Sequence, residues 1–224
     1  MASERAAQLR GLYAITPELD DTNLLAERVA RSLAGGAALV QYRAKTLGGL
    51  LAREQAARLA ALCRAAGAIF IVNDSIELAR ECGADGVHVG REDAAVALAR
   101  RALPHAIIGV SCYDEAERAQ AAARDGADYV AVGSMFASRT KPNARPAPLA
   151  AIARARAASG LPVAAIGGID LANAASVVDA GADMLAVISA LFEAPDIEAA
   201  ARGFAHLYQS PTRNTDARTQ PRPL

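Results

Sequence analysis

The chain has 224 residues with 24 basic and 24 acidic side chains, so its formal net charge is zero. A chain without excess charge has no overall attraction for nucleic acid or for an anionic membrane, and any anion-binding site must be local. It has no long uncharged apolar stretch, and the N-terminal MASERAAQLR has no apolar core, which predicts a cytoplasmic protein that stays out of the membrane. The three cysteines form an odd set without metal-ligand spacing, which argues against a disulfide scaffold and a zinc site.

Eight short apolar runs alternate with alanine-rich segments of helical period. Parallel strands need crossover connections of a dozen or more residues, and strands buried on both faces show continuous apolar runs. Both features predict an α/β protein with a single closed (β/α)8 TIM barrel. The predicted strands are residues 12–15, 38–41, 69–72, 86–89, 107–110, 129–132, 163–166 and 184–188.

The domain boundary is predicted where this alternation ends. Residues 1–209 are expected to form one barrel domain, somewhat smaller than the roughly 250 residues typical of such barrels, so its loops must be short. Residues 210–224 combine prolines with polar and basic side chains and have no aliphatic period. Such a composition predicts a disordered tail.

Polar side chains follow most of the predicted strands, which would place them on one rim of the barrel. Gln41, Arg43 and Lys45 alternate along an extended segment, so their side chains can point the same way. Arginine and lysine suit phosphate oxygens, and glutamine can hydrogen-bond a neutral heterocycle. This segment is predicted to be an anion-binding edge, with a solvated charged turn as the alternative.

Acidic side chains follow the next two strands. Asn73 and Asp74 end one apolar run, and Asp93 lies just past the following strand. Two carboxylates from neighbouring strand ends can share one Mg²⁺ ion, which also takes substrate phosphate and water as ligands. A magnesium and diphosphate site is therefore predicted. Asp74 and Asp93 can instead cap the helices that follow them.

Two strands carry single polar groups whose roles stay open. His88 lies within the strand 86–89 and is either a packed residue or a substrate contact. Ser111 ends its strand and either orients substrate or forms a turn. Cys112 follows it and could face the site, although no base lies near it in sequence.

A long segment and a glycine pair complete the predicted rim. Residues 133–147 are rich in Gly, Ser, Pro and Asn, and long loops in compact domains are usually functional. There Ser138 and Thr140 offer hydroxyls, and Lys141 could lie over a leaving group. After the last two strands, Gly167, Gly168, Ile188 and Ser189 match the place where many barrels bind phosphate through backbone amides.

Together these segments resemble the thiamine phosphate synthase family, whose barrel enzymes join the pyrimidine and thiazole halves of thiamine phosphate. The resemblance runs from LYAITP at 12–17 to VISALF at 187–192. It departs from the family at Arg91, where glutamine is frequent, and in the SMFASRTK loop. The motifs that carry it are QYRAK, VNDSIELA, DGVHVGRED, IGVSCYDEAERA, GADYVAVGSMFASRTKP and VAAIGGI.

The resemblance implies a role for each polar strand exit. The substrates would be hydroxymethylpyrimidine diphosphate and thiazole phosphate or its carboxylated form, joined by a dissociative alkyl transfer, and Asp74 and Asp93 would bind Mg²⁺. The pyrimidine diphosphate would be held by Gln41, Arg43, Lys45, Asn73, Ser111 and Lys141. Of these, the catalytic group would be Arg43, Lys45, Ser111 and Lys141. The thiazole phosphate would be held by Ser138, Thr140, Gly168, Ile188 and Ser189.

Two rival functions fit part of this pattern. A thiazole tautomerase of the same lineage would bind thiazole phosphate and move a proton, but it needs neither the metal carboxylates nor the full basic set. A non-catalytic barrel that binds thiamine precursors would keep the site without the reaction. The expected partners are small molecules and neither nucleic acid nor membrane, and the question of a homo-oligomer is left open.

Overall fold

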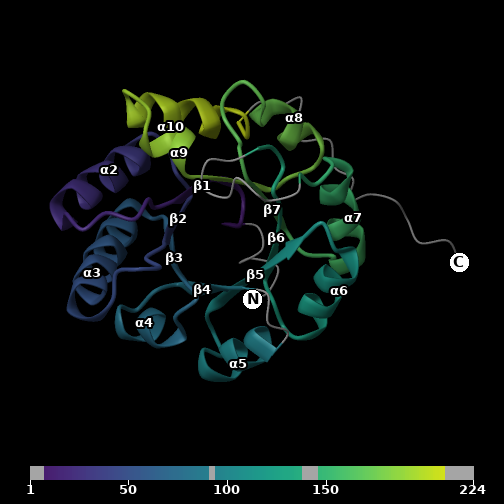
Figure 1. Ribbon diagram of the computed structural model, residues 1–224, viewed down its shortest axis with the longest axis horizontal. Helices are drawn as coiled ribbons and strands as arrows, with labels where there is room; N and C mark the ends of the chain where they lie inside the picture. The colour runs from purple at the N-terminus through teal and green to yellow at the C-terminus, as the bar shows by residue number, and fades with distance from the viewer. Residues whose placement is uncertain (1–7, 91–93, 138–145, 210–224) are drawn as a thin grey trace, which may run out of the picture.

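The structure, a computed structural model, describes residues 8–90, 94–137 and 146–209. Its eight parallel strands form a closed barrel in which each strand pairs with the next and β1 pairs with β8 (Figure 1). The predicted (β/α)8 barrel is confirmed. The strands are β1 Gly11–Ile15, β2 Leu39–Tyr42, β3 Ile69–Asn73, β4 Gly86–Val89, β5 Ile107–Tyr113, β6 Tyr129–Gly133, β7 Val163–Ile166 and β8 Met184–Val187.

Helices surround the barrel as an outer ring (Figure 1). Alanine-rich faces pack on the strands, and this helix–strand layer contains the larger part of the core. None of the described helices is both long and apolar enough to cross a bilayer. They are α2 Thr22–Ala34, α3 Gly49–Ala66, α4 Ile76–Glu81, α5 Ala94–Ala102, α6 Ala116–Arg124, α7 Ala150–Ser159, α8 Ala174–Asp179, α9 Ser189–Phe192 and α10 Ile197–His206.

Strand β5 differs most from its prediction. It was expected to end at residue 110 and continues to Tyr113, with a register shift between Ser111 and Tyr113 against β6. Tyr113 has a positive φ of 57°, which is uncommon for a bulky residue, and bulges next to active sites often re-aim a side chain. Cys112 points away from the cavity into the helix–strand core, where burial raises the pKa of its thiol to about 12. The idea that Cys112 faces the site is therefore wrong.

The amino ends of the strands carry a repeated polar contact. The tripeptide Gly-Ala-Asp occurs three times, ending at Asp85, Asp128 and Asp183, directly before β4, β6 and β8. Each aspartate accepts a hydrogen bond from a backbone N–H at the start of the preceding strand, which satisfies a donor that the ladder leaves open. The bonds are Phe70 to Asp85 at 2.8 Å, Ile108 to Asp128 at 2.8 Å and Val163 to Asp183 at 2.7 Å.

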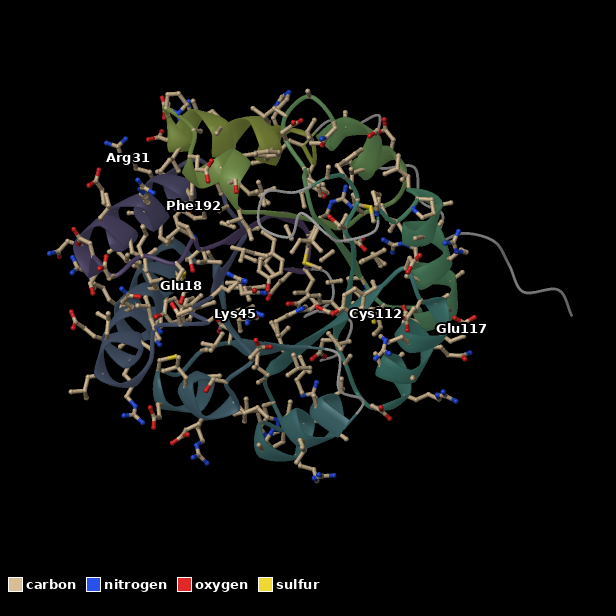
Figure 2. The ribbon with its side chains drawn as sticks, viewed as in Figure 1. Glu18, Arg31, Lys45, Cys112, Glu117 and Phe192 are labelled. Carbon is tan, nitrogen blue, oxygen red and sulfur yellow. The ribbon has the colours of Figure 1, made fainter. Side chains whose placement is uncertain are left out.

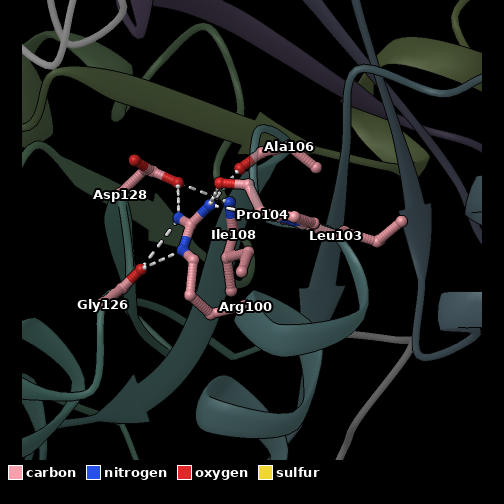
Figure 3. A network of polar contacts seen from close by, with 7 residues as sticks. All are labelled: Arg100, Leu103, Pro104, Ala106, Ile108, Gly126 and Asp128. Atoms are coloured by element: carbon pink, nitrogen blue, oxygen red, sulfur yellow. Dashed lines mark hydrogen bonds and ion pairs between the residues drawn. The ribbon is translucent and has the colours of Figure 1, made fainter.

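Arg100 extends one of these contacts into a network (Figure 3). Its guanidinium pairs with Asp128 at 2.6 Å and donates to the carbonyl of Gly126 at 2.9 Å. It also donates to the carbonyls of Pro104 and Ala106 at 3.1 and 2.8 Å. The network joins α5 to the starts of β5 and β6. It lies at the end of the barrel where such folds usually place stabilising contacts.

Candidate active site

A cavity of about 1000 Å³ opens at the carboxyl ends of the strands. It gathers side chains from both halves of the chain, as the polar strand exits predicted. The predicted site residues that line it are Gln41, Arg43, Lys45, Asn73, Asp74, Ser111, Gly168, Ile188 and Ser189. The remaining predicted site residues, which lie outside the described residues, are Asp93, Ser138, Thr140 and Lys141.

The segment after β2 supplies the cationic edge of the cavity. Gln41 is only 3% exposed and points inward, whereas Tyr42 points outward and donates to Gln55 of α3 at 2.9 Å. The alternation continues through Arg43 and Lys45, which both line the cavity. The predicted common orientation of these three side chains is therefore confirmed.

Glu18 holds the loop that follows Lys45, a contact that no local pattern in the sequence predicts. Its carboxylate accepts hydrogen bonds from the Thr46 hydroxyl at 2.7 Å and from the backbone N–H groups of Thr46 and Leu47. The bonds from Thr46, led by its hydroxyl, lower the pKa of Glu18 to about 2. Figure 2 shows Glu18 and Lys45 beside each other on the β2 side of the barrel. We call the hydrogen bonds from Thr46 and Leu47 to the Glu18 carboxylate the Glu18 clasp.

Asp74 stands at the end of β3 in a left-handed conformation, with a φ of 62°. The Asn73 side-chain amide donates to Asp74 Oδ2 at 2.6 Å, and the Asp74 backbone donates to the His88 carbonyl at 2.8 Å. Ser75, and not Asp74, caps α4 by accepting from the Leu78 N–H at 3.1 Å. The alternative in which Asp74 is a helix cap is therefore wrong, and its carboxylate lines the cavity instead.

Polar side chains cross the floor of the cavity in one hydrogen-bonded chain. Gln41 Nε2 donates to the Tyr13 hydroxyl at 2.7 Å, and this hydroxyl lies 2.7 Å from that of Tyr129. His88 Nδ1 lies 2.9 Å from the Tyr129 hydroxyl, and His88 Nε2 lies 3.0 Å from Ser111 Oγ. His88 thus points into the barrel. We call these five side chains the floor chain.

The two tyrosines of the floor chain could not be singled out from the sequence. Tyr13 and Tyr129 stand within apolar runs and look like ordinary strand residues. The only local signal is Gly109, since a methyl group there would lie 2.0 Å from the Tyr129 ring. A glycine within a strand often marks such a close approach, but it does not say what approaches.

The β7 and β8 exits form the opposite wall of the cavity. Gly167 and Gly168 have positive φ values of 103° and 62°, and side chains there would collide with Ser134 and with the Ala137 carbonyl. Phe136 donates its N–H to the Gly167 carbonyl at 2.9 Å, which draws the segment after β6 against this exit. Ser189 begins α9, where the first N–H groups have no partner within the helix.

Comparison with known proteins identifies the lineage. The sequence profile of the family described as "Thiamine monophosphate synthase" matches residues 12–191. The chain belongs to the thiamine monophosphate synthase family. The "Thiamine-phosphate synthase" of Aromatoleum aromaticum is 53% identical over 204 residues, covering 91% of this chain and 98% of that protein. The synthase of Chromobacterium violaceum is 54% identical over 200 residues, covering 88% and 96%.

Solved structures place this member of the family on the same barrel. Thiamine phosphate pyrophosphorylase from Pyrococcus furiosus superposes with a TM-score of 0.82 at 35% identity, covering 92% of this chain and 98% of that one. A 3-hexulose-6-phosphate synthase superposes with a TM-score of 0.66 at 23% identity, covering 87% and 98%, and shares the fold alone. The names of the relatives favour the synthase over the tautomerase and the non-catalytic barrel.

Proposed function

We propose that this thiamine phosphate synthase binds its two substrates together in the rim cavity. The pyrimidine diphosphate would occupy the β2 to β5 side and the thiazole phosphate the β7 to β8 side. The observation that carries this proposal is that Arg43 and Lys45 line the same cavity of about 1000 Å³ as Gly168 and Ser189. This volume lies at the upper end of the range for ligand pockets, which suits two bound molecules.

The reaction transfers a pyrimidine methylene group. The bond between the methylene carbon and the diphosphate oxygen breaks, and its electron pair leaves with the diphosphate. The lone pair of the thiazole nitrogen then forms the new carbon–nitrogen bond. No general base is needed, because the attacking nitrogen carries no proton. The amino group of the pyrimidine spreads the positive charge of a short-lived cation, which favours a dissociative path.

The protein's main task is to stabilise the leaving group. Arg43 and Lys45 line the cavity on the diphosphate side, and Lys141 is proposed to join them from the segment that follows β6. Fixed charges aimed at developing negative charge usually make one of the largest contributions to catalysis. Holding both substrates in one cavity adds orientation, and excluding water protects the cation from hydrolysis.

Asp74 and Asp93 are proposed to hold Mg²⁺ against the diphosphate. The Asp74 carboxylate fits this role, because Oδ2 is held by Asn73 and Oδ1 faces the β4 exit, lying 3.8 Å from where a Gly90 side chain would begin. Asp93 follows Gly90 by three residues in the sequence. One or two carboxylates with substrate phosphate suit magnesium, and the bound ion would neutralise charge on the diphosphate.

The thiazole phosphate is proposed to bind the backbone N–H groups of Gly168, Ile188 and Ser189, with Ser138 and Thr140 adding hydroxyls. Gly168, Ile188 and Ser189 all line the cavity, which supports this placement. Barrels of this type frequently bind phosphate after their last two strands. Gln41, Asn73 and Ser111 would then orient the pyrimidine and its diphosphate.

The direct test mixes the purified chain with hydroxymethylpyrimidine diphosphate, thiazole phosphate and Mg²⁺ and measures thiamine phosphate. Product should form only when all three are present, and omitting each in turn tests each proposed role. Diphosphate binding that depends on Mg²⁺ without product would support the non-catalytic barrel. Conversion of the thiazole phosphate alone into an isomer would support the tautomerase.

A further inference from the structure

The floor chain links five strands through buried polar groups. Its members come from β1, β2, β4, β5 and β6, in the hydrogen-bonded order Gln41, Tyr13, Tyr129, His88 and Ser111. Tyr129 is fully buried and is the one member that does not line the cavity. It can therefore influence a ligand only through its neighbours.

Once the donor of the first hydrogen bond in the floor chain is known, the donor and the acceptor of every other bond follow. Gln41 donates from Nε2, so the single Tyr13 hydrogen is left for the Tyr129 hydroxyl, the other polar atom bonded to it among the described residues. The Tyr129 hydrogen then goes to His88 Nδ1, so this order requires Nδ1 to carry no hydrogen and His88 to donate from Nε2 to Ser111. Burial raises the pKa of both tyrosines above the usual range, so both phenols keep their hydrogens.

This order determines what the two ends present to the cavity. The side-chain oxygen of Gln41 accepts no hydrogen bond from the residues that the structure describes, although only 3% of the residue is exposed. At the other end, Ser111 Oγ already accepts from His88, so the Ser111 hydrogen is available to a ligand. The cavity thus offers an acceptor at Gln41 and a donor at Ser111.

We infer that Tyr13, Tyr129 and His88 are positioning residues that keep an acceptor at Gln41 and a donor at Ser111. The part of the cavity that would hold the pyrimidine ring then selects an aminopyrimidine over an oxopyrimidine. The inference rests on the proposed function, in which a pyrimidine lies beside Gln41. An amino group donates to the Gln41 oxygen, and a ring nitrogen accepts from Ser111. An oxo group would face the Gln41 oxygen with an acceptor, and buried polar groups left unpaired penalise the wrong ligand strongly.

Nitrogen NMR of the full-length protein tests the direction of donation in the floor chain without any substrate. The chain contains three histidines, and the variants His105→Gln and His206→Gln identify the remaining signals as those of His88. We expect His88 to show a bare Nδ1 and a hydrogen on Nε2. A hydrogen on Nδ1 would overturn the inference. It would reverse the direction of donation in every hydrogen bond of the floor chain and turn the Gln41 side-chain nitrogen toward the cavity.

A matched pair of tyrosine variants tests the effect on specificity. Tyr129→Phe removes the hydroxyl that connects Tyr13 to His88, whereas Tyr42→Phe removes the hydroxyl of another buried tyrosine, which bonds Gln55 outside the cavity. We expect Tyr129→Phe to lower the preference for the aminopyrimidine diphosphate over its oxo analogue, measured as a ratio of kcat/KM, by about tenfold. Tyr42→Phe should leave that ratio unchanged.

Inhibition by inorganic diphosphate separates this role from general damage, since diphosphate has no ring. Tyr129→Phe should leave its inhibition constant within about twofold of wild type. An unchanged substrate ratio in Tyr129→Phe, or an equal loss of diphosphate affinity, would overturn the inference. If Tyr129→Phe does not fold, Tyr13→Phe serves instead. It removes the hydroxyl between Gln41 and Tyr129 and is expected to give the same loss of preference for the aminopyrimidine. Failure of the wild-type chain to make thiamine phosphate would instead overturn the proposed function.

Discussion

Asp74 combines an uncommon backbone conformation with a carboxylate at the mouth of the barrel. Its φ of 62° is accessible to aspartate and asparagine at small cost but is unfavourable for most other residues. The conformation turns the chain between β3 and α4, while Ser75 provides the helix cap. Backbone geometry and charge at this position can therefore be separated by experiment.

Asp74→Asn should lower turnover by at least about 100-fold at saturating Mg²⁺, because it keeps the backbone conformation and removes one charge that would hold the ion. The neighbouring variant Ser75→Ala is the control. It should lower the free energy of unfolding by about 1 kcal/mol through loss of the cap and leave turnover near wild type. Steady-state kinetics with urea unfolding checks both, and near wild-type turnover in Asp74→Asn would contradict the metal assignment.

At the scale of elements, each strand was predictable where its sequence is apolar, and the connections were not. The runs at 69–72, 86–89 and 163–166 mark strands because burial on both faces demands continuous aliphatic residues. The cationic edge and the Asp74 exit followed from the same pattern, since parallel strands end on one rim. The floor chain and the Glu18 clasp join residues distant in sequence, and no local periodicity reports such pairings.

The Glu18 clasp should make stability depend on pH. The folded-state pKa of Glu18 is about 2, below the ordinary value of 4.5, so the ionised carboxylate stabilises the fold above pH 4.5 and this stabilisation is lost as the pH falls toward 2. Glu18→Gln should therefore unfold more easily than wild type at pH 6, with the difference shrinking as the solution is acidified. Urea unfolding across this range measures it.

Asp20→Asn is the control for this measurement, because Asp20 is an exposed neighbour on the same loop. Its free energy of unfolding at pH 6 should stay within about 0.5 kcal/mol of wild type, as is usual for a surface substitution. Equal stability of Glu18→Gln and wild type at pH 6 would show that the clasp contributes nothing to the fold.

Across the whole molecule, the two ends of the barrel hold different kinds of polar group. The rim carries cationic and acidic side chains around a cavity, whereas the opposite end carries aspartates whose hydrogen bonds are satisfied by backbone. The Arg100 network belongs to this second end (Figure 3), and none of its residues lines the cavity. Stability and chemistry should accordingly respond to different substitutions.

Arg100→Ala should lower the free energy of unfolding by about 1–3 kcal/mol, because it leaves the Asp128 carboxylate and several carbonyls without their partner. Its turnover should stay near that of wild type. Arg101→Ala, a change at the exposed neighbouring residue, should alter stability by no more than about 0.5 kcal/mol. A large loss of turnover in a folded Arg100→Ala protein would show that the two ends of the barrel are coupled.

The three Gly-Ala-Asp contacts bear on how such a barrel can change over generations. They anchor the starts of strands whose far ends carry the polar groups of the cavity, so one strand serves both purposes at sites three or more residues apart. A substitution at the rim leaves the anchors intact, and a descendant can acquire a new substrate without first losing its fold. Because the two kinds of site lie apart on each strand, residues at the rim can be substituted while the contacts at the strand starts are kept.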